Sequence, residues 1–83
     1  MINKDTSIAF QSLDLRGVPC PANFIRCRLF IEQLEPNNSF YLDLDRGEAE
    51  DNVLSGLREE GHNIEILFTE AKWLRLKVTC VAS

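Results

Sequence analysis

The sequence predicts an α+β fold, a two-layer sandwich in which two helices cover one face of a four-stranded mixed sheet. Its length of 83 residues is enough for one domain and too short for two. Stretches with alternating apolar residues and stretches with apolar residues every three or four positions follow one another in the order βαβαββ. Because strand–helix–strand crossovers are right-handed, two consecutive crossovers that move the same way place both helices on one face.

The first strand and the first helix are joined by a short glycine turn. Leu13 and Leu15 alternate with Asp14 in a strand that Gly17 ends. A helix then begins at Pro21, a position that proline favours, and continues to about residue 34. Its apolar residues form a main stripe that we expect in the core, and a narrower stripe that we expect between the helices. The main stripe is Phe24, Cys27, Phe30, Ile31 and Leu34, and the narrower one is Ile25 and Leu29.

The second half of the chain adds a strand, a helix and a hairpin. Asp45 and Glu48 form a capping-box-like pair at the start of the second helix, and Gly61 ends it. A turn over residues 70–72 joins the last two strands. We expect the apolar residues that alternate in the strands, or repeat every four positions in the helix, to face the core. They are Phe40, Leu42, Leu44, Ala49, Val53, Leu57, Ile64, Ile66, Phe68, Leu74, Leu76, Val78 and Cys80. The other sheet face is expected in water, with Glu65 and Thr69 beside Arg75 and Lys77.

Charge and cysteine usage narrow the class of protein. The net charge of −4 repels phosphate backbones and anionic membranes, so neither direct nucleic-acid binding nor membrane binding is expected. The pattern holds neither a signal peptide nor a membrane span. Three cysteines without a CxxC pair indicate reduced thiols and a cytoplasmic location. Residues 1–8 are expected to form a flexible tail before a single domain over residues 9–83.

Cys20 is the candidate reactive residue because it directly precedes Pro21 at the start of the first helix. The partial positive charge at a helix start favours a thiolate, and the first N–H groups of the helix are free to face it. A cysteine that only caps the helix or fills a small space is an equally good interpretation of this residue by itself. Cys27 and Cys80 fall at core-facing positions and are expected to be small buried apolar residues.

Cofactor and metal sites find no support in the sequence. His62, the only histidine, precedes the third strand at the sheet end opposite Cys20, roughly 15 Å away for a strand that rises about 3.3 Å per residue. The cysteines and this histidine offer no closely spaced pair of metal ligands. The four glycines do not form a phosphate-binding loop.

The string LDLRGVPCP, residues 13–21, resembles the opening motif of the TusA/SirA family of small sulfur-carrier proteins. The family has the order βαβαββ, and its motif cysteine carries sulfur as a persulfide. The resemblance implies that Cys20 is the sulfur-carrying residue and that the motif around it comprises Arg16, Gly17, Pro19, Pro21 and Asn23. It also implies sulfurtransferase-type activity without a cofactor, a donor protein of the cysteine desulfurase or rhodanese type, and an acceptor protein.

The chain departs from the family's Cys-Pro-x-Pro string, because Asn23 stands where the second proline is expected. Two hypotheses follow. In the first, the protein is a cytoplasmic sulfur carrier that relays persulfide sulfur through Cys20. In the second, it is a non-catalytic binding or regulatory module that retains the fold while the loss of the proline relaxes the site.

The predicted topology brings further side chains to the sheet edge at which the helices begin. We expect Arg16, Asp45, Arg46, Lys72 and Trp73 there. Arg46 and Lys72 are candidates for a rim that stabilises a sulfur anion, and ordinary surface charge is the alternative. If helix two leaves Ile25 and Leu29 uncovered, they form an apolar patch beside Cys20 at which a donor or acceptor binds. The sequence leaves the oligomeric state open.

Overall fold

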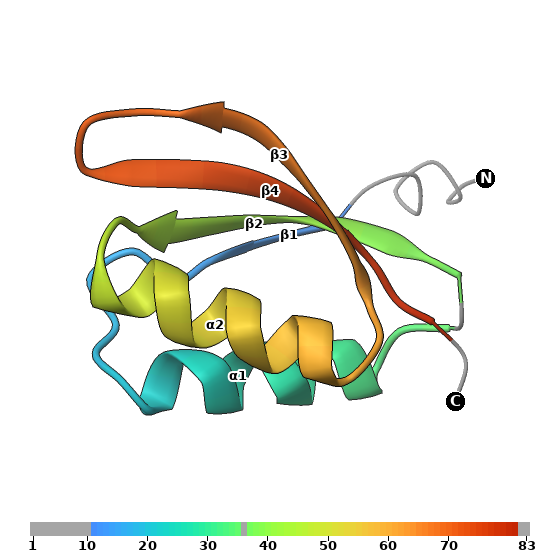
Figure 1. Ribbon diagram of the computed structural model, residues 1–83. Coiled ribbons are helices and arrows are strands. Elements are labelled where there is room, and N and C mark those ends of the chain that lie inside the picture. The colour runs from blue at the N-terminus through green and yellow to red at the C-terminus, as the bar shows by residue number, and fades with distance from the viewer. Residues whose placement is uncertain (1–10, 36, 82–83) are drawn as a thin grey trace, which may run out of the picture.

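The computed structural model describes residues 11–35 and 37–81. The predicted tail over residues 1–8 lies outside these ranges. The elements are β1 (Gln11–Asp14), α1 (Ala22–Glu32), β2 (Ser39–Asp45), α2 (Glu48–Glu59), β3 (Asn63–Thr69) and β4 (Trp73–Thr79). Their order is βαβαββ, as the sequence predicts, and both helices lie on the same face of one sheet (Figure 1). The predicted α+β sandwich is therefore confirmed.

The sheet has the strand order β1-β2-β4-β3. β1 is parallel to β2, whereas β4 pairs antiparallel with both β2 and β3. The first three strands therefore point the same way. As a result, both helix starts and the β3–β4 turn lie at one end of the molecule (Figure 1).

The core lies between the two central strands and the helices. Leu42 of β2 pairs with Leu76 of β4, and neither side chain has any exposed surface. Burial of a side chain of this size contributes roughly 1.5–3 kcal/mol, so this pair of strands anchors the fold. The predicted inward residues that the structure buries are Cys27, Phe40, Leu42, Leu44, Val53, Leu57, Leu74, Leu76, Val78 and Cys80.

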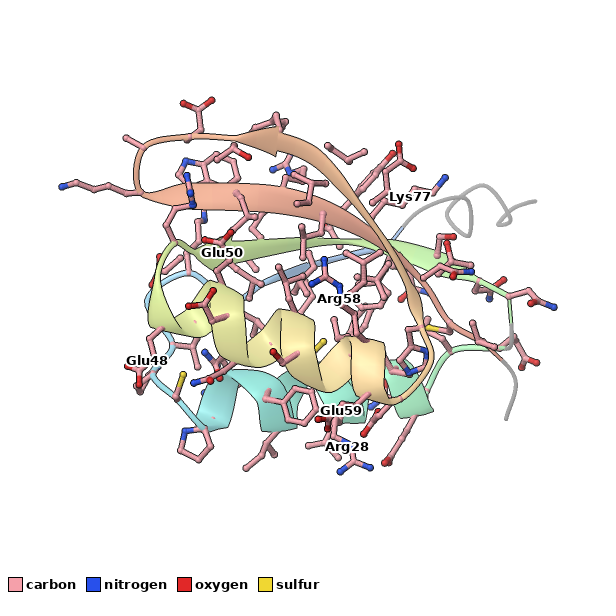
Figure 2. All side chains as sticks on the ribbon, viewed as in Figure 1. Arg28, Glu48, Glu50, Arg58, Glu59 and Lys77 are labelled. Atoms are coloured by element: carbon pink, nitrogen blue, oxygen red, sulfur yellow. The ribbon has the colours of Figure 1, made fainter. Side chains whose placement is uncertain are left out.

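The two helices touch where α2 has a glycine. The Phe24 ring of α1 lies against Gly56, and a Cβ built on Gly56 would be 2.5 Å from Phe24 Cζ. Glycine thus permits a helix approach that any larger residue would obstruct. Farther along, Arg28 of α1 forms an ion pair with Glu60 at 3.1 Å, and Figure 2 shows Arg28 below the C-terminal half of α2.

The edge strand β3 differs from the prediction. The sheet register shifts between Ile66 and Phe68, and Phe68 lies opposite Arg75 rather than on the core-facing side. The bulge exchanges the faces of the residues that follow it, so alternation along β3 is broken and residues 66–68 are all exposed. Glu65 pairs with Lys77 as expected, but Thr69 lies opposite Leu74.

The cap of α2 also differs from the prediction. The cap residue is Gly47, and Glu50 reaches back to its N–H at 3.4 Å. Asp45 is used elsewhere, because its carboxylate accepts the N–H of Gly17 at 2.8 Å. The prediction that Asp45 and Glu48 pair as the cap is therefore wrong.

Arg75 forms an ion pair across the open sheet face. Its guanidinium donates to both carboxylate oxygens of Asp43, at 2.7 and 3.0 Å. Asp43 is 8% exposed, so the pair neutralises a buried charge. Across the described ranges, no helix is long and apolar enough to cross a membrane.

Candidate functional site

A tight loop delivers Cys20 from the end of β1 to the start of α1. Leu15 extends the strand pairing through its N–H, which donates to the Asp43 carbonyl at 2.9 Å. Gly17 follows at a φ of 81°, a left-handed conformation that favours glycine, and its N–H donates to the Asp45 carboxylate. The N–H of Val18 returns to the Leu15 carbonyl at 3.1 Å. Asp43 and Asp45, at the C-terminal end of β2, thus hold the loop in place.

The sulfur of Cys20 accepts hydrogen bonds from two side-chain amides. Cys20 itself is partly exposed. Asn23, the second residue of α1, places its Nδ2 3.2 Å from Cys20 Sγ. Asn52 of α2 places its Nδ2 3.4 Å from the same atom. The two helices therefore contribute one donor each to one sulfur.

Asn23 is fully buried, and the orientation of its amide is defined by its neighbours. Its Oδ1 accepts the backbone N–H of Phe24 at 2.6 Å. Because a backbone N–H can only donate, the oxygen must face Phe24 and the NH2 group must face Cys20. Its own backbone N–H donates to the Pro19 carbonyl at 3.0 Å.

These contacts correct the expected source of stabilisation at the sulfur. The sequence predicts that free backbone N–H groups of α1 face Cys20. Instead, the N–H groups of Asn23 and Phe24 are used by Pro19 and by the Asn23 side chain, and Pro21 is the cap residue rather than the first helical residue. The donors at the sulfur are side chains. Asn52 was missed because it is 32 residues away in the sequence, and only the packing of α2 on α1 brings it close.

The predicted rim residues lie at the expected end of the sheet but bind one another. The Arg46 N–H donates to the Lys72 carbonyl at 2.9 Å, and its guanidinium binds Glu50 at 2.8 Å and the Glu70 carbonyl at 3.1 Å. Figure 2 shows Glu50 at the N-terminal end of α2. Among the residues that the structure describes, the side chains that donate to Cys20 Sγ are the two asparagines, so the anion-stabilising role of Arg46 and Lys72 stays a prediction.

Arg16 points to the open sheet face. It donates to both carboxylate oxygens of Asp14 at 2.9 Å and lies over the Trp73 ring, 4.5 Å from its centroid. The hydrogen bonds from Arg16 are the largest cause that lowers the pKa of Asp14 to about 2. Arg16 therefore links the loop after β1 to Trp73 at the start of β4.

The other two cysteines are buried. Cys27 has no exposed surface, and burial is the largest cause that raises its pKa to about 12. Cys80 is 4% exposed, and burial raises its pKa as well. All three thiols are free of disulfides. Cys20 is thus the accessible thiol of the chain.

His62 lies far from Cys20, next to the end of α2, as expected of a turn residue. Its Nδ1 accepts the N–H of Val81 at 3.2 Å, and its Nε2 lies 3.8 Å from Glu60 Oε1. With Ile31, these residues line a surface depression of about 410 Å³. Within residues 11–35 and 37–81, no three histidine, cysteine or acidic side chains gather as metal ligands.

Comparison with known proteins identifies the family of the chain and agrees with the fold. The family model described as sulfurtransferase TusA matches residues 11–79. The chain belongs to the TusA family. Its membership indicates a general role as a sulfur carrier or sulfurtransferase, and TusA-family proteins act in sulfur relay with partner proteins.

A solved structure supports the fold of this TusA-family chain. The SirA-like protein from Desulfitobacterium hafniense superposes with a TM-score of 0.71 at 18% identity, over 86% of this chain and 97% of that one. At this identity the likeness shows the fold. A search of curated proteins gives no significant match.

Proposed function

We propose that this TusA-family chain carries a sulfur atom on Cys20, as a persulfide, from a donor protein to an acceptor protein. One observation carries the proposal: Cys20 is partly exposed and receives two amide donors at its sulfur, whereas Cys27 and Cys80 are buried. A thiolate is the nucleophilic form of cysteine, and donors at the sulfur favour that form.

The relay has two steps. In loading, the Cys20 thiolate attacks the outer sulfur of the donor's persulfide. The donor's S–S bond breaks, a new S–S bond forms at Cys20, and the donor leaves as a thiolate. In discharge, a nucleophile of the acceptor attacks the outer sulfur, and the electron pair of the S–S bond returns to Cys20 Sγ. Both steps follow the ordinary course of thiol–disulfide exchange.

The surface beside Cys20 supports docking of a partner. Ile25 and Leu29 are 52% and 54% exposed, so the expectation that they pack between the helices is wrong. They lie on α1, five and nine residues after Cys20. Exposed apolar side chains of this size are typical of interaction surfaces, and we assign them to a donor of the cysteine desulfurase or rhodanese type and to the acceptor.

The motif residues hold the loop in this proposal. Gly17 supplies the left-handed turn, Pro19 accepts the N–H of Asn23, and Pro21 caps α1. Arg16 contacts the Trp73 ring at the neighbouring sheet edge. The cytoplasmic location stays a prediction.

Loading can be tested with a cysteine desulfurase and cysteine. Intact mass spectrometry of the wild type is expected to show one added sulfur atom that a reductant removes. Cys20→Ser should abolish the addition, while Cys80→Ala, a matched loss of one thiol, should keep it. Addition at Cys27 or Cys80, or none from a competent donor, would contradict the proposal and favour the binding or regulatory module.

A further inference from the structure

Position 23 bears a polar side chain in a place that has no access to water. Asn23 is 0% exposed, and burial of an amide costs free energy unless both of its ends are hydrogen-bonded. The oxygen end is satisfied by the N–H of Phe24. The nitrogen end has the Cys20 sulfur at 3.2 Å.

The charge of the accepting sulfur atom decides how much the second hydrogen bond stabilises the buried amide. A neutral thiol is a weak acceptor, whereas hydrogen bonds to a charged group are about twice as strong as those between neutral groups. A buried amide that faces Sγ is therefore better satisfied when the sulfur is an anion. Asn52 adds a second N–H to the same atom, at 3.4 Å, from the exposed surface of α2.

We propose that Asn23 and Asn52 are positioning residues that hold the Cys20 sulfur as an anion through their side-chain N–H groups. The inference rests on the proposed function and deepens it. In loading, the two donors increase the population of the attacking thiolate. In discharge, they stabilise the same thiolate as the leaving group, when the electron pair of the broken S–S bond returns to Sγ. Asn23 in this chain thus acts on the sulfur directly, which a proline at this position could not do.

Isosteric substitutions test the two donors. Asn23→Asp and Asn52→Asp keep the shape and the accepting oxygen but replace the N–H donor with a second oxygen. Asn38→Asp controls for the change in net charge, because Asn38 is exposed in the loop between α1 and β2. Asn52→Leu removes the N–H donor without adding a charge beside the sulfur, and so separates loss of the donor from repulsion by a carboxylate. Asn52 is exposed, so its variant keeps the test decisive if Asn23→Asp fails to fold.

The first measurement is the rate at which iodoacetamide alkylates Cys20 as a function of pH. At neutral pH, each variant is expected to react about three- to tenfold more slowly than the Asn38→Asp control, because less thiolate is present. At alkaline pH, the rates should become equal to that of the control or exceed it. A less stabilised thiolate is intrinsically more nucleophilic, which accounts for the reversal. Slower alkylation at every pH would indicate a thiol that has become inaccessible, and would overturn the inference.

The second measurement follows sulfur itself. Each protein is loaded with glutathione persulfide and discharged with dithiothreitol, and intact mass gives the rate at which the added sulfur leaves. Discharge from Asn23→Asp and Asn52→Asp should be about three- to tenfold slower than from Asn38→Asp. If the variants load normally, and if their rates of discharge and alkylation equal those of the control, this inference is overturned and the proposed function is not. Failure of the wild type to load from glutathione persulfide and from a desulfurase would overturn the proposed function, and the role in transfer with it.

Discussion

Gly56→Ala tests whether the close contact between the helices exists and whether it positions the site. In an undisturbed helix this change stabilises by about 1 kcal/mol, because alanine has the higher helix propensity. Here the new Cβ would lie 2.5 Å from Phe24 Cζ, inside the distance that real Cβ contacts show. Crowding of this kind costs about 1–3 kcal/mol. The free energy of unfolding is therefore expected to fall by up to about 2 kcal/mol.

The assay is urea unfolding followed by circular dichroism. Ser55→Ala, at the preceding exposed position of α2, is the matched control and should raise the free energy of unfolding by a few tenths of a kcal/mol. Because the crowding atom belongs to Phe24, Gly56→Ala should cost less in a Phe24→Leu background. A displacement of α2 that relieves the crowding would also move Asn52 away from Cys20. Alkylation of Cys20 at neutral pH would then become slower.

Two results would refute this reasoning. If Gly56→Ala stabilises the chain by about 1 kcal/mol, propensity alone governs the position and the helices do not touch there. If its cost is unchanged in the Phe24→Leu background, the two residues are not coupled.

Three further predictions concern the core, the open sheet face and the docking surface. Because burial raises the pKa of Cys27 to about 12 from an ordinary value of 9.0, its contribution to stability is complete below about pH 9 and is lost as the pH rises towards 12. The free energy of unfolding, from urea titrations, should fall by up to about 1.4 kcal/mol per pH unit there, and Cys27→Ala should flatten this slope; equal slopes would contradict the assignment. Arg75→Met should lower the melting temperature by leaving the carboxylate of Asp43 unpaired, and the double variant with Asp43→Leu should lose less than the sum of the single losses; additive losses would count against the pair. Ile25→Asp with Leu29→Asp should change the free energy of unfolding by less than about 1 kcal/mol because both residues are exposed, yet slow loading from a desulfurase more than tenfold; an equal slowing with glutathione persulfide would argue against docking.

The central strands could be predicted because their patterns are regular. In β2 and β4 every second residue is apolar and buried. The alternation in the sequence therefore predicts correctly which side chains of these strands face the core. In β3 the pattern continues to Phe68, but one extra residue in the strand turns this side chain to the other face. Alternation alone cannot reveal a bulge at a sheet edge, since both registers leave apolar residues next to solvent.

At the site, the sequence predicts the reactive residue but not its immediate partners. Cys20 is marked by the proline that follows it and by the motif before it. The amide donors are harder to find, because Asn23 is marked only as the residue that replaces the motif's second proline, and Asn52 resembles an ordinary exposed residue of α2. Their joint function depends on an approach of two helices that Gly56 permits, and such a contact becomes visible only in three dimensions.

The bulge in β3 bears on how the chain behaves at high concentration. β3 is the outer strand of the sheet next to β4, and Ile66, Leu67 and Phe68 are 49%, 39% and 39% exposed. A flat apolar edge of this kind would serve as a template for strands of neighbouring molecules. The register shift twists the strand just at these residues, so an incoming strand meets two short, misaligned segments instead of one long row of backbone groups. We therefore expect the register shift to disfavour pairing of β3 with a strand of a second molecule.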